Sequence, residues 1–354
     1  MATDALKSIW YITRKFPPSR GGMQQLSHRI ATELSALRPL TLLRWRAGQW
    51  GLPIFVLGAL LRLSWGLLRG RVGVLLLGDP VLSLLAVPAR WAGVPVAVVV
   101  HGLDLTYPNR CYQWYLRRFF RGRVDSCICI SRFVLDALIA RGEDESRCVL
   151  IHPGASESPM AETGGGNDSP PALLILGRLV RRKGALWFVR EVMPRLRASL
   201  GSMRLDIVGD GPERAAIAQA IRDANLDDAV RLWGDVDEAS KAQRLAQCDL
   251  LLMPNVRVEG DPEGFGLVAL EAAMSRRYVV AADLEGLRDA VAHPELGRLL
   301  PTEDADLWAL AIVELLADRQ GLRAKGEAAR AYAAAHCSWR QMGRRYAECL
   351  DALV

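Results

Sequence analysis

The chain reads Asp249-Leu250-Leu251-Leu252-Met253-Pro254 and, a few residues later, Glu263-Gly264-Phe265-Gly266-Leu267-Val268-Ala269-Leu270-Glu271. The first run is apolar and predicts a buried strand. The residues from Leu267 to Met274 have the composition and apolar spacing of a helix. Gly264 and Gly266 therefore lie where a strand passes into a helix. There, missing β-carbons let a ligand approach the backbone, and free N–H groups attract anions.

The two carboxylates that frame this turn, Glu263 and Glu271, do not suit an anion site unless they face another kind of group. Sugar and ribose hydroxyls fit, because a carboxylate accepts their hydrogen bonds strongly. The local chemistry thus indicates a phosphate flanked by two polyols, which describes a nucleotide sugar. The alternative interpretation is a glycine-rich turn with two solvated glutamates.

Further turns follow apolar strands in the same half of the chain. The run 173–176 predicts a strand that leads into Gly177-Arg178 and Lys183-Gly184, and the run 205–208 predicts one that ends at Gly209. Arg178 and Lys183 can hold two oxygens of one diphosphate, whereas we interpret Arg181 and Arg182 as solvated basic residues. Such turns lie at the edge where doubly wound sheets bind ligands.

These motifs, in this order and spacing, resemble those of family-4 glycosyltransferases, which are retaining enzymes with the two-lobed GT-B fold. The resemblance covers nearly the whole chain. The segments that carry it are Pro17-Pro18-Ser19-Arg20-Gly21-Gly22, Val100-His101-Gly102, Ile130-Ser131-Arg132-Phe133, Ile151-His152-Pro153-Gly154, Gly177-Arg178 with Lys183-Gly184, Ile207-Val208-Gly209-Asp210-Gly211-Pro212, and Pro262-Glu263-Gly264-Phe265-Gly266 with Glu271-Ala272.

The resemblance implies an α/β fold of two Rossmann-like lobes with the active site in the cleft between them, and it suggests roles for individual residues. The residues expected to be catalytic are His101, Arg178, Lys183 and Glu263. The residues expected to bind the donor are Gly21, Gly22, Gly209, Val236, Gly264, Phe265, Gly266, Leu267 and Glu271. Asp235 and Asp237 have the spacing of a metal motif but lie in the loop that the family places near the nucleobase. We therefore expect no metal ion, because cationic side chains and helix N-termini can neutralise the diphosphate.

The composition fits a globular enzyme with two cores: 354 residues, 51% of them apolar. The seven scattered cysteines and the absence of an evident signal peptide favour free thiols in a reducing cytoplasm. The apolar region 72–100 is interrupted by polar residues, prolines and glycine. It therefore predicts a strand (74–77), a helix (about 81–91) and a strand (94–100) instead of a membrane span.

The composition of residues 155–171 is that of a linker, because the segment is poor in large apolar residues and rich in glycine and proline. We therefore expect an N-terminal acceptor lobe in residues 1–154 and a nucleotide-sugar-binding lobe in 172–336. Residues 337–354 are predicted to form a helix, which the resemblance places back on the first lobe.

Two segments of the first lobe have the pattern of basic amphipathic helices with aromatic residues, about 53–70 and 112–123. Arginines are interspersed among the apolar side chains of the first, as Arg62 and Arg69, and Arg44, Arg46 and Arg71 flank it. This pattern suits the surface of an anionic bilayer, although ordinary helices packed on a sheet share it.

Our leading hypothesis is a retaining, metal-independent glycosyltransferase in the cytoplasm, on the inner face of the membrane. It would move a sugar from a nucleoside-diphosphate sugar, UDP preferred over GDP, to a lipid-linked or cell-envelope glycan acceptor. No cofactor and no nucleic-acid partner is expected. The alternatives are a GT-B epimerase or phosphorylase, a transferase acting on a soluble acceptor, and a non-catalytic scaffold.

Overall fold

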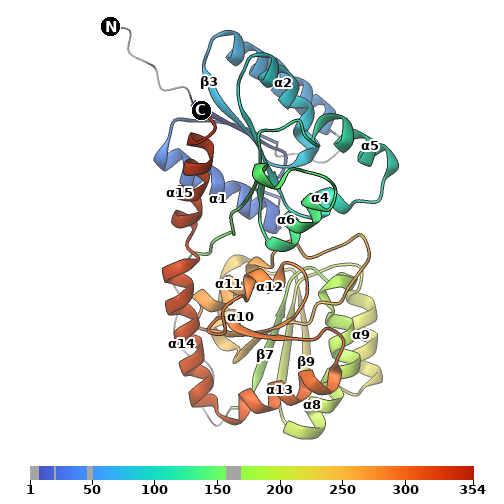
Figure 1. Cartoon of the computed structure of the whole chain (residues 1–354). Helices are drawn as coiled ribbons and strands as arrows, with labels where there is room; N and C mark the ends of the chain where they lie inside the picture. Colours follow the sequence, from blue (N-terminus) through green and yellow to red (C-terminus); the bar gives the residue numbers. More distant parts are fainter. Residues whose placement is uncertain (1–7, 20, 46–50, 157–168) are drawn as a thin grey trace. The chain divides into compact units, whose positions relative to one another are not determined.

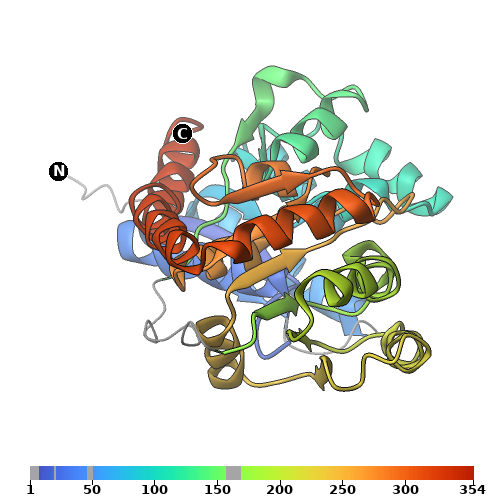
Figure 2. The ribbon, with the colours of Figure 1, turned by 90° about the horizontal axis from the view of Figure 1, so that it is seen from below.

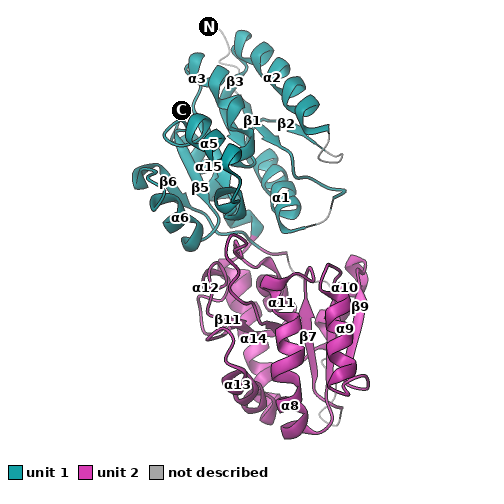
Figure 3. Ribbon diagram, turned by 90° about the vertical axis from the view of Figure 1, so that its right-hand side faces the viewer, with its two compact units in different colours: residues 1–154, 339–354 teal, residues 155–338 magenta. Residues whose placement is uncertain are grey.

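The computed structural model describes residues 8–19, 21–45, 51–156 and 169–354 of the chain. Arg20, Arg46 and the predicted glycine-rich segment 164–168 lie outside the described residues. The chain forms two compact units, one of residues 1–154 with 339–354 and one of residues 155–338 (Figure 3). Each unit holds one six-stranded parallel sheet with interleaved helices, which confirms the predicted α/β class.

The sheet of unit 1 has the order β2-β1-β3-β4-β5-β6. Its strands are β1 (Ser8–Thr13), β2 (Leu40–Arg44), β3 (Val72–Leu77), β4 (Val96–Val100), β5 (Ser126–Cys129) and β6 (Cys148–Leu150). The three central strands β3, β4 and β5 are buried along their whole length. Parallel strands covered by helices on both faces need apolar side chains on both faces, and this is why their sequences show no alternation.

The helices of unit 1 (Figure 1) are α1 (Gly22–Leu37), α2 (Leu52–Leu68), α3 (Ala86–Trp91), α4 (Leu103–Thr106), α5 (Arg110–Phe119), α6 (Arg132–Ile139) and α15 (Trp339–Asp351), with the 3₁₀ helices η2 (Pro80–Leu85) and η3 (Glu145–Arg147). The single helix predicted over about 81–91 is wrong, because η2 and α3 share that segment. Pro88 lacks an N–H group and clashes with a preceding helical turn, so an α-helix can hold it only in its first turn. The α-helix accordingly begins at Ala86.

The last helix, α15, belongs to unit 1 although unit 2 precedes it in the chain. It packs on α1 so closely that a β-carbon added at Gly343 would lie 2.4 Å from Cβ of Glu33. An ion pair of 2.6 Å between Arg38 and Asp351 joins the two helices near their ends. The inward face of α15 is apolar or aromatic, and four of its buried side chains are Trp339, Met342, Tyr346 and Leu350.

The sheet of unit 2 has the order β12-β11-β10-β7-β8-β9. Its strands are β7 (Ala172–Leu176), β8 (Arg204–Val208), β9 (Val230–Gly234), β10 (Leu250–Met253), β11 (Tyr278–Ala282) and β12 (Gly297–Leu300). Its helices are the 3₁₀ turn η4 (Arg181–Lys183), α7 (Ala185–Trp187), a π-helical turn η5 (Phe188–Val192), α8 (Met193–Leu200), α9 (Arg214–Asp223), α10 (Glu238–Gln247), α11 (Leu267–Met274), α12 (Leu287–Ala290), α13 (Ala305–Ala317) and α14 (Arg319–His336). Helices α13 and α14, coloured orange to red, run at an angle to one another (Figures 1 and 2).

Helix α2 differs from the other helices of unit 1 in how much apolar surface it exposes. Its buried residues are two small ones and one leucine: Ala59, Gly66 and Leu63. A β-carbon at Gly66 would lie 2.6 Å from the ring of Trp10, so the helix lies close to the sheet along this narrow face. Five large apolar side chains point to solvent: Ile54, Leu57, Leu61, Trp65 and Leu68. Within the described residues, no helix is long and apolar enough to cross a bilayer.

Candidate functional site

The loops that carry the sequence motifs of unit 2 meet at the carboxyl edge of its sheet. Strand β7 lies between β10 and β8, and all three run parallel. The turns that follow them, which begin at Gly177, Gly209 and Pro254, therefore lie at one edge. A small hollow there is lined by Gly177, Arg178, Lys183 and Asn255, among other residues. The structure thus brings together the two cations that were predicted to hold a diphosphate.

Two glycines in these turns are required by close packing between the loops. A β-carbon at Gly209 would lie 1.9 Å from the carbonyl oxygen of Gly177, and one at Gly184 would lie 1.7 Å from that of Pro254. Both glycines also have positive φ angles. Gly209 was predicted as a donor-binding residue, and its observed role is to let the loop after β8 touch the loop after β7.

Glu263 is the centre of the most concentrated group of charges at this edge. One of its carboxylate oxygens lies 2.6 Å from Nζ of Lys183 and 3.6 Å from Nε of Arg182. The side-chain amide of Asn255 donates to the same oxygen at 3.1 Å. Burial alone would raise the pKa of Glu263, but Lys183, Arg182 and the hydrogen bonds outweigh it and lower the pKa. Glu263 is therefore held as a carboxylate although it is buried.

Arg182 is not the solvated residue that the sequence led us to expect. Its guanidinium donates to both carboxylate oxygens of Asp261, at 2.9 and 3.0 Å, and its side chain is only 22% exposed. The prediction is wrong because Asp261, in the loop after β10, packs back against the loop after β7. Arg178 and Arg181, in contrast, are exposed.

The main chain of Glu263 is held from a second direction by the turn between β11 and α12. The backbone N–H of Glu263 donates to a carboxylate oxygen of Glu285 at 2.5 Å. The N–H of Gly286 donates to the carbonyl of Glu263 at 3.1 Å. Asn255, Asp261 and Glu285 were not identified from the sequence, because no motif marks them and only the folded chain brings them to Glu263.

Helix α11 begins at Leu267, as predicted, and Gly266 precedes it with a φ angle of +92°. Its first turn carries no acidic side chain, so its free N–H groups and its positive dipole end are not neutralised by the helix itself. Phe265 is only 4% exposed. Of the predicted donor-binding residues in this stretch, Phe265 can therefore offer its backbone but not its ring to a ligand.

Glu271 forms a second glutamate–lysine pair, one turn inside α11. Its carboxylate lies 2.8 Å from Nζ of Lys241, which comes from α10. Burial would lower the pKa of Lys241, but Glu271 and then Glu238 outweigh this and raise it, so that the lysine stays charged. Lys241 was missed in the sequence, since its spacing from Glu271 carries no signal.

The loop predicted to lie near a nucleobase runs from Gly234 to α10 and includes Val236, which is partly exposed. Asp237 caps α10 by accepting a hydrogen bond from the N–H of Ser240 at 2.7 Å. An aspartate at the N-cap position commonly accepts this hydrogen bond, so the contact is a helix cap. No group of three or more His, Cys, Asp or Glu side chains in the described part of the chain is arranged to hold a metal ion.

In unit 1, His101 follows β4 and is 6% exposed. Its Nε2 lies 2.9 Å from the carbonyl oxygen of Gly78 and donates to it, which leaves Nδ1 as an acceptor in the neutral imidazole. Nδ1 is buried and has no hydrogen-bond partner among the residues that the structure describes. The backbone N–H of His101 donates to the carboxylate of Asp104, at 3.1 and 3.0 Å to its two oxygens. Burial raises the pKa of Asp104.

The other predicted residues of unit 1 lie at the start of α1. Gly22 is the first residue of this helix, and Gly21 precedes it with a φ angle of +141°. Both are exposed, and the first turn of α1 carries no acidic side chain. The positive end of a sixteen-residue helix is thus open at this point.

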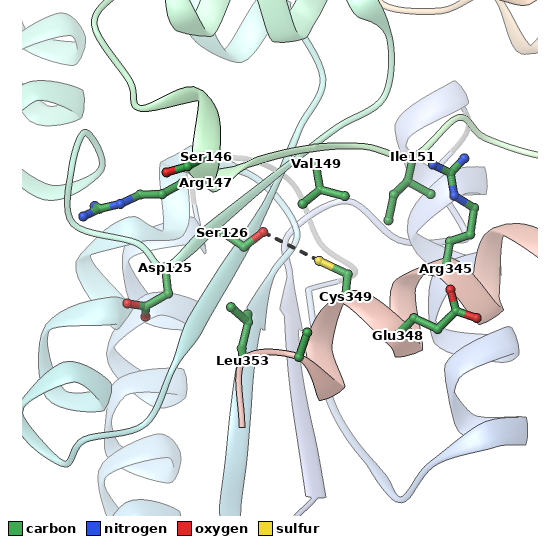
Figure 4. A pocket seen from close by; sticks show the side chains of 11 residues that line it. Asp125, Ser126, Ser146, Arg147, Val149, Ile151, Arg345, Glu348, Cys349 and Leu353 are labelled. Carbon is green, nitrogen blue, oxygen red and sulfur yellow. Dashed lines mark hydrogen bonds between the residues drawn. The ribbon is translucent and has the colours of Figure 1, made fainter.

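A larger pocket, of about 300 Å³, lies elsewhere in unit 1, between the end of α15 and the strands β5 and β6 (Figure 4). Ser126 and Cys349 touch within it at 3.6 Å. Its two arginines, Arg147 and Arg345, share it with Asp125 and Glu348. It contains none of the residues predicted for the site.

Comparisons with known proteins show which proteins this chain resembles. A family model described as glycosyl transferases group 1 matches residues 170–318, and one described as glycosyltransferase family 4 matches residues 21–158. The structure is similar to the crystal structure of HepE from Anabaena in complex with UDP, with a TM-score of 0.76, 19% identity, and coverage of 98% of this chain and 100% of that one. That likeness confirms the GT-B fold.

Two curated relatives come from Mycolicibacterium smegmatis. The chain is 31% identical to a phosphatidyl-myo-inositol mannosyltransferase over 73% of its own length and 64% of that protein. It is 26% identical to a GDP-mannose-dependent alpha-(1-6)-phosphatidylinositol monomannoside mannosyltransferase over 96% of its own length and 97% of that protein. The first match therefore spans less than two thirds of its relative. The chain therefore has the GT-B fold, and models of glycosyltransferases match both of its units.

Proposed function

We propose that the protein transfers a mannosyl residue from GDP-mannose to a lipid-linked acceptor, with retention of configuration at the anomeric carbon and without a metal ion. The observation that carries the proposal is the 2.6 Å ion pair between Lys183 and Glu263 at the carboxyl edge of the unit 2 sheet. It holds a cation and a buried carboxylate side by side, beside an open helix N-terminus. A sugar diphosphate needs these groups in close proximity.

The leaving diphosphate is bound by Arg178, Lys183 and the backbone N–H groups around Gly266 and Leu267. Arg178 and Lys183 line one hollow, and the start of α11 adds the positive end of its dipole. Groups fixed before the reaction cost no reorganisation when charge develops on the leaving oxygen. These positively charged side chains and the helix N-terminus support departure of the diphosphate without a metal ion.

Glu263 accepts hydrogen bonds from hydroxyl groups of the transferred sugar. Within the described residues, Lys183 and Asn255 both contact Oε2 of Glu263, which leaves acceptor capacity at Oε1. Glu271 accepts from the ribose hydroxyls, with Lys241 holding its carboxylate in place. Gly264 and Phe265 contribute backbone, and Val236 lies in the loop that faces the base.

His101 accepts a hydrogen bond from a hydroxyl of the same sugar through Nδ1. This buried nitrogen has no hydrogen-bond partner in the described part of the chain, and a buried polar atom is costly to leave unpaired. A sugar hydroxyl provides the missing donor. Gly21 and Gly22 offer backbone N–H groups at the start of α1 to a phosphate of the donor or the acceptor.

GDP-mannose is proposed in place of the UDP sugar that we expected from the sequence. The support is the name of the relative that the chain matches over nearly its whole length, a GDP-mannose-dependent enzyme. Both relatives are named for phosphatidylinositol acceptors, which supports an inositol phospholipid or its mannosylated form as acceptor.

Peripheral contact with an anionic membrane is proposed at α2. Its exposed apolar residues fall at positions 54, 57, 61, 65 and 68, which is the spacing of a single helical face. The exposed arginines Arg62, Arg69 and Arg71 supply attraction to anionic lipid. An acceptor in the inner leaflet of the cytoplasmic membrane would then lie within reach of a protein that stays on the surface.

The test is transfer of labelled mannose from GDP-mannose to phosphatidylinositol in vesicles, with UDP-glucose and UDP-galactose as competing donors and EDTA in a parallel reaction. We expect lipid-soluble label from GDP-mannose, an α-linked product by NMR, and little loss with EDTA. Arg178→Ala should abolish most of the activity, and Arg181→Ala, in the same loop, serves as the matched control. Transfer from no nucleotide sugar would overturn the proposal, and a UDP sugar as the better donor would overturn its choice of base.

A further inference from the structure

Glu285 adopts a backbone conformation that its residue type disfavours. It lies in the turn between β11 and α12 with a φ angle of +47°, in the left-handed region. A β-carbon clashes there with the backbone, so glycine is the residue expected at such a position. Strain of this kind persists where the surrounding structure or a function requires the side chain.

The side chain of Glu285 contacts the main chain of Glu263. Its carboxylate accepts the backbone N–H of Glu263 at 2.5 Å. The next residue, Gly286, donates its N–H to the carbonyl of Glu263 at 3.1 Å. The dipeptide 285–286 therefore bonds both polar groups of the Glu263 backbone.

The same turn also restricts the glycine-rich loop sterically. A β-carbon at Gly286 would lie 2.2 Å from the carbonyl oxygen of Gly264, so the two turns are in contact at this point. With its backbone held from this side, the side chain of Glu263 lies toward Lys183 and Asn255. A glycine at position 285 would relax the strained turn but would release the N–H of Glu263.

We infer that Glu285 is a positioning residue for sugar transfer, which fixes the Glu263 backbone so that its carboxylate meets the transferred sugar in the reactive geometry. The inference rests on the proposed function of Glu263. Glu285 acts through Glu263 and touches neither nucleotide nor diphosphate. Its removal should accordingly affect the turnover number and leave nucleotide affinity almost unchanged.

The chain offers a matched control in Glu303, a second glutamate with a positive φ angle, +59°. Its side chain is exposed, so the change Glu303→Gly relieves the same backbone strain without removing a contact to the site. The experiment compares Glu285→Gly, Glu285→Gln and Glu303→Gly with the wild type. The readouts are kcat and KM for GDP-mannose, Kd for GDP by calorimetry, Tm, and exchange of the Glu263 amide hydrogen.

Glu285→Gly should lower kcat by about ten- to a hundredfold, on the scale that small misplacements of reacting groups cause. Its Kd for GDP should stay within about twofold, its Tm should not fall, and its Glu263 amide should exchange faster. Glu285→Gln should recover most of the activity, because the amide oxygen can accept the same hydrogen bond. Glu303→Gly should match the wild type in kcat and in Glu263 exchange.

The inference is overturned by a kcat of Glu285→Gly that equals that of Glu303→Gly. It is also overturned by a parallel loss of Tm and GDP affinity, which would mark a merely structural residue. If the wild type transfers no sugar from any donor, the proposed function fails separately. The exchange rate of the Glu263 amide hydrogen then tests the positioning role of Glu285. If this rate is the same in Glu285→Gly as in the wild type, the positioning role is rejected.

Discussion

The carboxyl edge of the unit 2 sheet and the outer face of α2 present opposite kinds of surface. At the sheet edge, the buried Glu263 is already held by Lys183, and Glu271 by Lys241. On α2, large apolar side chains are exposed: Leu68 is 83% exposed and Ile54 is 73% exposed. A small polar ligand is bound well by charges that are fixed before it arrives, since little ordering is left to be done. A membrane is bound by apolar area and screened charge, which need no such order.

The substitution with the largest expected effect on activity, and so the strongest test of a preorganised sheet edge, is at Lys183. Lys183→Ala removes a cation from the diphosphate and leaves the buried Glu263 without its closest partner. We expect kcat to fall by about 10²–10³-fold, the scale of losing one preorganised donor. Steady-state kinetics with GDP-mannose measures it, and Arg181→Ala is the control for loss of a positive charge in the same loop. Turnover of Lys183→Ala within about threefold of wild type would show that the edge is not preorganised for the diphosphate.

The two glutamates should differ in what their removal weakens. Glu271→Ala should weaken GDP binding by about ten- to a hundredfold, because a charged acceptor for two hydroxyls is worth about 1.5–3 kcal/mol. Glu263→Ala should leave GDP binding nearly intact and lower kcat with the sugar donor. Calorimetry with GDP and kinetics with GDP-mannose separate the two. An equal loss of GDP affinity in both variants would contradict the assignment.

A smaller effect is expected on the membrane side. Leu61→Glu introduces a negative charge in the middle of the exposed face of α2 and should reduce co-flotation with anionic vesicles several-fold, with Tm unchanged because the residue is 65% exposed. Leu310→Glu is the matched control, since Leu310 is a 55% exposed leucine on helix α13 of unit 2. Wild-type binding should also decrease at high salt. If the wild type does not bind anionic vesicles at low salt, the proposed membrane contact of α2 is wrong.

The smallest effect is on the pH dependence of stability. The pKa of Glu263 is lowered from the ordinary value of 4.5, so its contribution is present above pH 4.5 and is lost as the pH falls through the folded-state pKa. Glu263→Gln should therefore flatten the decline of Tm on acidification below pH 4.5, whereas Glu259→Gln, at an exposed position in the same loop, should not. Parallel melting curves for the two variants would argue against a native ion pair.

Local patterns in the sequence predicted most of the framework. Helix α11 has the predicted bounds, Leu267–Met274, because its start is marked by glycine and its apolar spacing is continuous. The strands β7, β8 and β10 were predicted to within a residue or two, since buried parallel strands are short apolar runs that end in turns. Local sequence patterns therefore predict where helices and strands begin and end and where the loops between them lie.

The partners within the site could not be predicted, because they depend on contacts between distant residues. Arg182 and Asp261 are 79 positions apart, and Glu285 lies 22 positions after Glu263. Nothing in the sequence distinguishes Arg182, which is paired, from Arg181, which is exposed. The same reason explains why Lys241 was missed: a lysine on a helix is ordinarily solvated, and only the fold brings it to Glu271.

Because α15 is the last helix of the chain and yet belongs to the first unit, the order of synthesis on the ribosome differs from the order of assembly. The residues of unit 2 leave the ribosome before α15 can pack on α1. A nascent chain that stops before Trp339 leaves the apolar face of α1 open, and we expect it to be bound by chaperones and to be sensitive to protease. Unit 1 can therefore complete its packing only after unit 2 has been synthesised.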